Sequence, residues 1–179
     1  MKISKILFPS LFIMLTIFSG CSNDDTDQGN SKEFPMTAKI NGILYEMTNP
    51  FGTNEDTARI FGYNYSNQDY IILQGRPDLN INALSKEINI FINRDDLKVG
   101  TYNVGVDTDE VTTHIDLIDL ETIETENTIS GNITITSIDT TNKIVKGTFE
   151  FDAADESNIN SPINSVVTEG TFNYKYDVR

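Results

Sequence analysis

The chain has 179 residues, enough for one domain with a short additional segment, and its net charge is −14. Such acidity argues against binding to nucleic acid, which needs a basic surface, and against electrostatic docking onto anionic lipid. The single cysteine excludes an internal disulfide. A chain of this length buries a hydrophobic core without one.

The first element of the chain, residues 1–20, is predicted to be a signal peptide. Lys2 and Lys5 give it a positive start, and the apolar stretch Ile6–Phe18 is too short for a comfortable transmembrane helix. It ends in the sequence FSGC, which resembles the lipobox of bacterial lipoproteins. The resemblance implies cleavage before Cys21 and attachment of diacylglycerol and a further acyl chain to that residue. The alternative is an ordinary secretory signal.

Residues 21–33 follow as a polar, acidic and glycine-containing segment without apolar residues to bury, apart from the cysteine that opens it. We expect it to be a flexible tether. Its Ser22–Asp25 run resembles the short acidic export tag of Bacteroidota lipoproteins that reach the cell surface. We therefore expect a lipid-anchored protein of the bacterial outer membrane, exposed at the cell surface. A periplasm-facing protein with a plain linker is the alternative.

The domain, residues 34–179, begins with two predicted β-hairpins. Phe34–Ile40 and Ile43–Met47 alternate apolar and polar residues around Asn41-Gly42, which favours a two-residue turn with positive φ angles. Arg59–Tyr65 and Asp69–Arg76 form the second strand pair. The loop between the two hairpins carries proline and glycine as breakers.

Further strands are predicted at Glu87–Asn93 and Ser165–Tyr176, with a long hairpin over Ser130–Ala154. Asp78–Lys86 fits either a loop or a short helix. Val111–Ile123 fits a strand with a bulge, although its apolar spacing also fits one side of a helix. We favour the strand because β-branched residues dominate there.

A short phrase, Gly-Thr followed by an aromatic residue, recurs at Gly100, Gly147 and Gly170. Glycine in a strand allows a bend or the close approach of another backbone. Together the elements predict an all-β fold of about nine or ten strands. Its architecture would be a single antiparallel β-sandwich or a partly open β-barrel, with a lipocalin-like barrel as the alternative.

Several phrases of the chain resemble an uncharacterised family of Bacteroidota, mostly flavobacterial, lipoproteins. They are the lipobox, the opening Met36–Gly42, the pattern from Gly131 to Phe151, and the closing Thr168–Phe172. The resemblance implies an all-β domain without an assigned activity. It supplies no catalytic or ligand-binding residue.

The residues offer little for catalysis, and we expect a protein that is not an enzyme and needs no cofactor. The single histidine, His114, shares a strand face with Asp116, so any catalytic triad must include it. Calcium is the more sensible ionic ligand, because clustered carboxylates offer hard oxygens. The candidates are Asp107, Asp109 and Glu110, with Asp152, Asp155 and Glu156 as a second set.

Two further groups of residues are candidate functional sites. Phe61, Tyr63 and Tyr65 share one strand face, so they form either an aromatic binding patch or part of the core. Thr57 and Thr140 each follow an aspartate, in a pattern that resembles the O-glycan attachment motif of exported Bacteroidota proteins.

We therefore expect a lipoprotein whose domain binds a small molecule, a glycan or a peptide. The small molecule could be an apolar one in a barrel mouth. The alternative is a structural or accessory subunit of an outer-membrane assembly, with an envelope protein as partner at an exposed sheet edge. A hydrolase is the third reading.

Overall fold

The computed structural model describes residues 34–50, 57–62, 69–77, 86–106 and 113–176. This part of the chain is built from ten strands and one 3₁₀ turn, η1 (Arg94–Asp96). The strands are β1 (Met36–Ile40), β2 (Ile43–Thr48), β3 (Thr57–Gly62), β4 (Asp69–Pro77), β5 (Lys86–Asn93), β6 (Gly100–Gly105), β7 (His114–Asp119), β8 (Glu124–Asp139), β9 (Ile144–Ala154) and β10 (Ser165–Tyr176).

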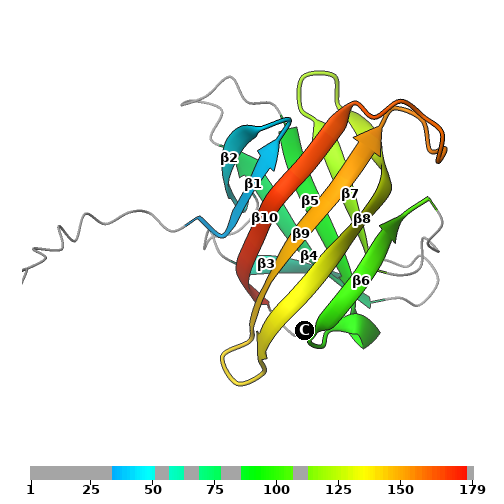
Figure 1. The fold of residues 1–179 in the computed structure, drawn as a ribbon. Coiled ribbons are helices and arrows are strands. Elements are labelled where there is room, and N and C mark those ends of the chain that lie inside the picture. Colours follow the sequence, from blue (N-terminus) through cyan, green and yellow to red (C-terminus); the bar gives the residue numbers. More distant parts are fainter. Residues whose placement is uncertain (1–33, 51–56, 63–68, 78–85, 107–112, 177–179) are drawn as a thin grey trace, which may run out of the picture. The chain divides into compact units, whose positions relative to one another are not determined.

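Eight of these strands close into an antiparallel barrel (Figure 1). Around the ring the order is β1, β2, β4, β5, β7, β8, β9 and β10, and β10 pairs with β1 to complete the circle. The expectation of an all-β fold is confirmed. Of the architectures that the sequence left open, the chain adopts a barrel, and this barrel is closed.

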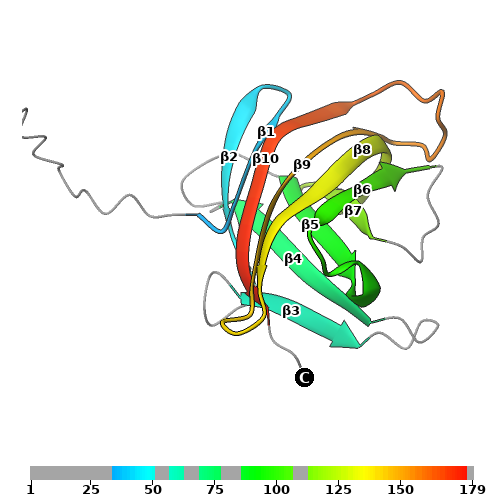
Figure 2. The ribbon, with the colours of Figure 1, turned by 60° about the horizontal axis from the view of Figure 1, so that its bottom comes forward.

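The remaining strands, β3 and β6, fill gaps in the barrel wall. One edge of β4 pairs with β2 at Arg76 and Pro77 and with β3 from Asp69 to Ile72. β3 also pairs in parallel with the last residues of β10, so it bridges β4 and β10 where β1 and β2 have ended (Figure 2). In a similar way, β7 pairs with the beginning of β8, at residues 124–126, and β6 pairs with the same strand further along, at residues 130–135.

The first predicted hairpin and the long predicted hairpin form where the turn chemistry placed them. Asn41 and Gly42 have φ angles of 50° and 81°, as the two-residue turn requires. The long hairpin is β8 and β9, and the alternating residues of β9 from Val145 to Ala153 are buried as predicted. Within the segment Val111–Ile123 a strand forms as predicted, but it is shorter and spans His114–Asp119.

That strand, β7, ends at Asp119 for a local reason. The Asp119 Oδ1 atom accepts hydrogen bonds from the backbone N–H groups of Glu121 and Thr122. A carboxylate that binds the backbone two and three residues ahead stabilises a turn. The turn reverses the chain, and β8 begins at Glu124.

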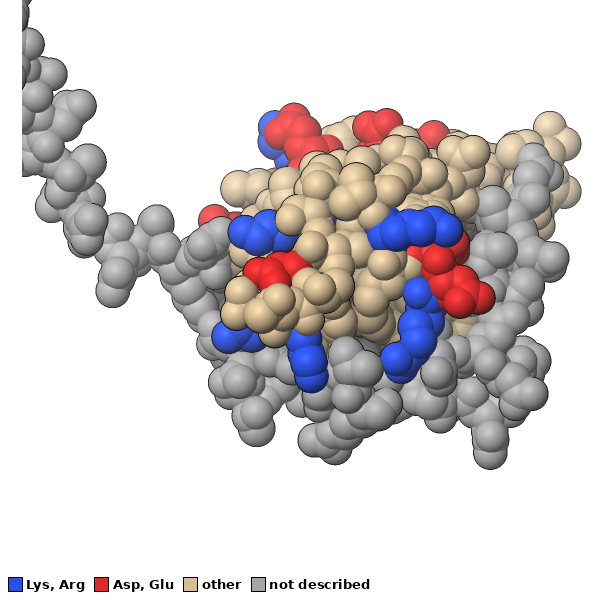
Figure 3. All heavy atoms as spheres, turned by 90° about the horizontal axis from the view of Figure 1, so that it is seen from below, with Lys and Arg blue, Asp and Glu red and all other residues tan. Residues whose placement is uncertain are grey.

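The barrel has two distinct ends. The mouth end carries the β1–β2 turn, the β7–β8 turn and the β9–β10 loop, whereas the far end carries η1 and the β8–β9 turn. Figure 3 looks onto the far end, where Lys and Arg side chains are prominent. Along the chain, Lys98 follows η1, Lys143 lies in the β8–β9 turn and Lys175 lies near the end of β10. Asp and Glu side chains lie on the same face (Figure 3).

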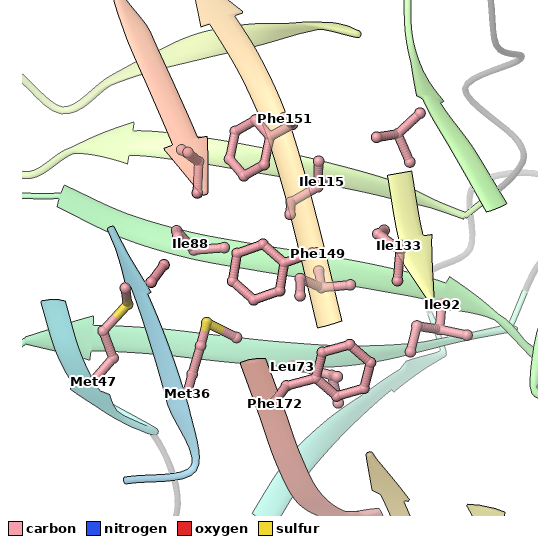
Figure 4. Close-up of a cluster of buried hydrophobic side chains, with 14 of the residues drawn as sticks. Met36, Met47, Leu73, Ile88, Ile92, Ile115, Ile133, Phe149, Phe151 and Phe172 are labelled. Carbon is pink, nitrogen blue, oxygen red and sulfur yellow. The ribbon is translucent and has the colours of Figure 1, made fainter. Parts of the chain in front are cut away.

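Side chains fill the interior of the barrel (Figure 4). Inward-facing Ile88, Ile90 and Ile92 of β5 are completely buried, because alternate residues of a strand face the same side. Phe149 and Phe172 occupy the centre, with ring centroids 6.5 Å apart. The middle of the barrel is thus a packed core.

Candidate functional site

A pocket of about 710 Å³ opens at the mouth end of the barrel. It lies among the start of β5, the β7–β8 turn, the beginning of β8, the β9–β10 loop and the β1–β2 turn. Every residue that lines it is polar: Asn41, Lys86, Asp119, Thr122, Glu124, Thr125, Glu126, Asp155, Asn164 and Ser165. We call this site the mouth pocket.

Strand alternation points the charged residues of the mouth pocket inward. Lys86 lies one inward position above Ile88 on β5, and Asp119 lies one inward position above Leu117 on β7. Lys86 pairs with Asp119 across the two strands, and Glu126 of β8 pairs with Leu117. The same rows that build the apolar core therefore end in a charged layer at the mouth.

Lys86 joins the two carboxylates of this layer. Its Nζ atom donates a hydrogen bond to Asp119 Oδ2 at 2.9 Å and another to Glu126 Oε1. Burial alone would lower the pKa of Lys86, but the hydrogen bonds to Glu126 and Asp119 raise it overall. Mainly through Lys86, and also through its backbone hydrogen bonds, the pKa of Asp119 falls to about 2. Lys86 and Asp119 are therefore both charged at neutral pH, and the ammonium group of Lys86 also contacts the carboxyl group of Glu126.

Glu126 keeps one oxygen unused. The residue is only 7 % exposed, and its Oε2 atom is buried without a hydrogen-bond donor among the described residues. A buried carboxylate oxygen without a donor is costly, because it has lost its water without a replacement. In addition, the pocket lining contains four carboxylates and one ammonium group. The mouth pocket thus presents surplus negative charge and an unused acceptor.

The predicted pair of His114 and Asp116 lies elsewhere, on the outer face of β7. The His114 ring stacks on Phe91 of β5, with centroids 4.4 Å apart, and Tyr70 packs edge-on against both rings. Burial raises the pKa of Asp116, and the neighbouring His114 partly opposes this effect. The pair shares one strand face as expected, but it is part of an aromatic cluster and does not reach the mouth pocket.

Other predicted sites lie partly or wholly outside the described residues. Cys21, Tyr63, Tyr65, Asp107, Asp109 and Glu110 all fall there. Phe61 lies on β3, where it pairs with Tyr70. Thr57 begins β3, and Thr140 is exposed in the β8–β9 turn. Lipidation, calcium binding and glycosylation at these positions stay predictions.

The second set of calcium candidates separates in the structure. Asp155 lines the mouth pocket, Asp152 lies within β9, and Glu156 is exposed in the following loop. Across the described ranges, no group of three or more His, Cys, Asp or Glu side chains is placed to hold a metal ion. Those same ranges also contain no helix long and apolar enough to cross a bilayer.

Sequence reasoning missed Lys86 and Glu126 as site residues. Lys86 fell in the segment Asp78–Lys86, which fitted either a loop or a short helix. The signal was nevertheless there, because Lys86 extends the inward row Ile88, Ile90 and Ile92 by one step. A lysine at the end of a buried row indicates a polar layer at the end of a barrel.

These features define an all-β protein with a closed barrel and a polar pocket at its mouth. The chain belongs to the DUF6252 family, a domain of unknown function, whose model matches residues 63–175. The match begins just before β4 and ends within β10. No curated protein and no solved structure matches the chain.

Proposed function

We propose that this protein is a lipid-anchored lipoprotein of the bacterial outer membrane whose barrel binds a small polar molecule at the mouth pocket without catalysing a reaction. The observation that carries the binding role is a pocket of about 710 Å³, lined by polar residues, above a packed core. Pockets of a few hundred Å³ or more suit small ligands.

An apolar ligand inside the barrel fits the chain less well. The packed side chains of Phe149, Phe172 and Leu73 occupy the centre of the barrel. The mouth pocket itself is lined by polar residues. The expected apolar small molecule is therefore replaced in this proposal by a polar one.

The charges in the mouth pocket favour binding over acid–base catalysis. A general acid needs a pKa near the working pH, whereas the pKa of Asp119 is about 2. Asp116, whose pKa is raised by burial, lies on the outer face of β7. The two carboxyl groups are therefore not arranged as an acid and its partner in one cleft.

The lipid anchor is supported by the sequence before the barrel. Lys2 and Lys5, the apolar stretch Ile6–Phe18 and the FSGC motif follow the order of a lipoprotein signal. Several acyl chains on Cys21 would give stable membrane attachment, whereas a single chain would not. The acidic segment after Cys21 supports display at the cell surface.

The anchor is tested with the full chain and its Cys21→Ser variant in a bacterium that processes lipoproteins. We expect the wild-type chain in the membrane fraction, with the mass of its acyl groups, and removable from intact cells by external protease. The variant should lose these groups and leave the outer membrane. An unmodified Cys21 in a soluble wild-type product would contradict the anchor.

The binding role is tested by blocking the mouth pocket. Asn164→Trp places a bulky side chain at the pocket lining, and Asn160→Trp places it in the same loop outside the lining. Thermal unfolding of the full chain is followed with a panel of sugars, amino acids and amines. At least one compound should raise the melting temperature of wild type and of Asn160→Trp, but not of Asn164→Trp. No stabilisation by any compound would contradict a polar binding site.

A second candidate function, an accessory subunit of an outer-membrane assembly, is favoured by apolar side chains at the mouth end. Ile123 is 75 % exposed, and Ile43 and Leu44 are each more than half exposed. Exposed apolar groups are typical of protein contacts when they lie together. An Ile43→Lys variant that lowered the native size of a complex isolated in mild detergent would support this role.

A further inference from the structure

We propose that the mouth pocket receives an organic cation, a primary ammonium or a guanidinium group, with Glu126 as its main acceptor. This inference rests on the proposed binding function and names the chemistry of the ligand. It follows from the unused oxygen, the surplus of carboxylates and the residues that surround the pocket.

The unused Oε2 atom of Glu126 is the first argument. Lys86 occupies the other oxygen of this carboxylate, and no described residue donates to Oε2. Buried polar atoms are nearly always hydrogen-bonded in folded proteins, so an exception at a pocket wall points to a missing donor. A ligand N–H group would be such a donor, and a charged one would make the stronger bond.

The charge of the pocket is the second argument. Lys86 neutralises part of the negative charge through Asp119 and Glu126. Glu124 and Asp155 add two exposed carboxylates to the lining. The excess negative charge of the lining would repel an anionic ligand, and a neutral ligand would not compensate it. A cation, in contrast, is attracted to the pocket before it makes contact.

An organic cation fits this layer better than a metal ion does. Within the described residues no three metal-ligating side chains converge, and the ammonium group of Lys86 lies between the nearest two carboxylates. Divalent metals need several oxygen ligands around one point. Lys86 itself illustrates the preferred chemistry, because an ammonium group already binds two carboxylates of this layer.

The edge of the pocket suits the carbon chain that carries such a cation. An exposed apolar residue directly adjoins lining residues in sequence: Ile123, in the β7–β8 turn, lies between Thr122 and Glu124. An aliphatic chain could contact this side chain while its charged end binds Glu126. Both a free alkyl diamine and the side chain of a lysine or arginine in a peptide have this shape.

The test is titration calorimetry of the full chain in a non-ionic detergent. Cadaverine and agmatine serve as free amines, Nα-acetyl-lysine amide represents a peptide side chain, and pentanol and glucose are uncharged controls. We expect the amines to bind and the uncharged compounds to bind at least tenfold more weakly. Higher ionic strength should weaken amine binding. Tighter binding of the lysine amide than of cadaverine would identify a peptide as the source.

Glu126→Gln is the decisive variant, because it keeps the shape of the side chain and removes its charge. We expect amine affinity to fall about tenfold or more, the usual effect of losing a charged hydrogen-bond partner. Glu121→Gln removes the same charge from an exposed residue outside the lining and should change affinity less than twofold. If Glu126→Gln does not fold, Asp155→Asn replaces it, with an expected loss of about threefold.

The outcomes separate this inference from the function on which it rests. Amine affinity that is unchanged in Glu126→Gln, or in Asp155→Asn where that variant is used, overturns the inference. If sugars bind the mouth pocket and amines do not, the organic cation is wrong and the polar binding site stands. If no polar compound binds, both the organic-cation site and the proposed binding function are contradicted.

Discussion

Lys86 links the stability of the barrel to the chemistry of its mouth. Its side chain is 19 % exposed, and its ammonium group contacts two carboxylates whose side chains are mostly buried. A buried ion pair adds little stability compared with well-packed apolar residues in its place, but removing only one partner is costly. Loss of Lys86 should therefore destabilise the protein mainly because Asp119 and Glu126 would stay in the mouth pocket without their partner.

Replacing Lys86 by methionine should destabilise the protein by about 3 kcal/mol, because the buried carboxyl group of Glu126 would lose its partner. Chemical denaturation of the full chain measures this change. The double variant Lys86→Met, Glu126→Leu should recover much of the loss, since it removes the isolated carboxyl group as well.

Lys39→Met is the matched control for the same substitution at an exposed ion pair. Lys39 and Glu169 form a salt bridge of 2.8 Å with side chains that are 39 % and 67 % exposed. Exposed pairs contribute at most about 1 kcal/mol. Equal losses for Lys86→Met and Lys39→Met would show that the inner position of Lys86 has no special effect.

The lowered pKa of Asp119 determines how its contribution to the free energy of unfolding changes with pH. Its pKa in the folded protein is about 2, below the ordinary value of 3.8. Its contribution is therefore fully present above pH 3.8 and is lost as the pH falls towards 2. Urea unfolding between pH 5 and pH 2 should show this loss in wild type. Asp119→Asn should be less stable at pH 5 and should lose less on acidification; parallel curves would contradict the assignment.

At the scale of strands, the recurring Gly-Thr-aromatic phrase has a packing explanation. Gly147 lies opposite Phe172, and Gly170 lies opposite Phe149, on neighbouring strands. A Cβ atom on Gly147 would lie 2.4 Å from the Phe172 ring, and one on Gly170 would lie 2.5 Å from the Phe149 ring. Each glycine thus provides the space that a phenylalanine of the next strand fills.

Gly147→Ala should therefore destabilise the barrel by about 2 kcal/mol, because the added methyl group also meets the Thr134 carbonyl oxygen. Thermal or chemical unfolding measures the effect. Gly100→Ala changes the same phrase where the nearest atom to the new Cβ is the Tyr102 hydroxyl oxygen at 3.5 Å. That control should unfold close to wild type, and similar losses for both variants would refute the packing explanation.

Local signals in the sequence predicted the hairpins well. Asn41-Gly42 supplies the residues that a two-residue turn requires, and period-two alternation from Val145 to Ala153 shows which side of β9 is buried. These features depend on neighbours along the chain. The end of β7 at Asp119 was harder to predict, because the hydrogen bonds that terminate the strand there leave no sign in the apolar pattern of Val111–Ile123.

Features that depend on distant pairing could not be predicted in the same way. Closure of the barrel rests on the pairing of β1 with β10, whose residues are separated by most of the domain. Alternation alone fits an open sandwich and a closed barrel equally well. The mouth pocket likewise assembles Lys86, Asp119 and Glu126 from three strands, and only the register between the strands brings them together.

At the scale of the whole molecule, the barrel wall is not equally strong all round. β8, β9 and β10 pair along most of their length, whereas between the described residues of β2 and β4 the pairs are Met47–Pro77 and Thr48–Arg76 alone. Proline has no N–H group to donate, which weakens this seam further. The wall should therefore open first between β2 and β4.

Hydrogen exchange of the backbone amides tests this order. We expect the slowest exchange in the inner part of β8, β9 and β10 and faster exchange at Met47, Thr48 and Arg76, because local opening exposes weakly paired strands first. Exchange is measured in the full chain under native conditions. Equal protection at the seam and in β9 would show that the barrel opens only as a unit.

The packed phenylalanine, isoleucine and methionine side chains beneath Lys86 block passage through the interior of the barrel. A ligand of the mouth pocket must therefore enter and leave by the same route. A protein or membrane surface that covered this route would slow both the association and the dissociation of the ligand.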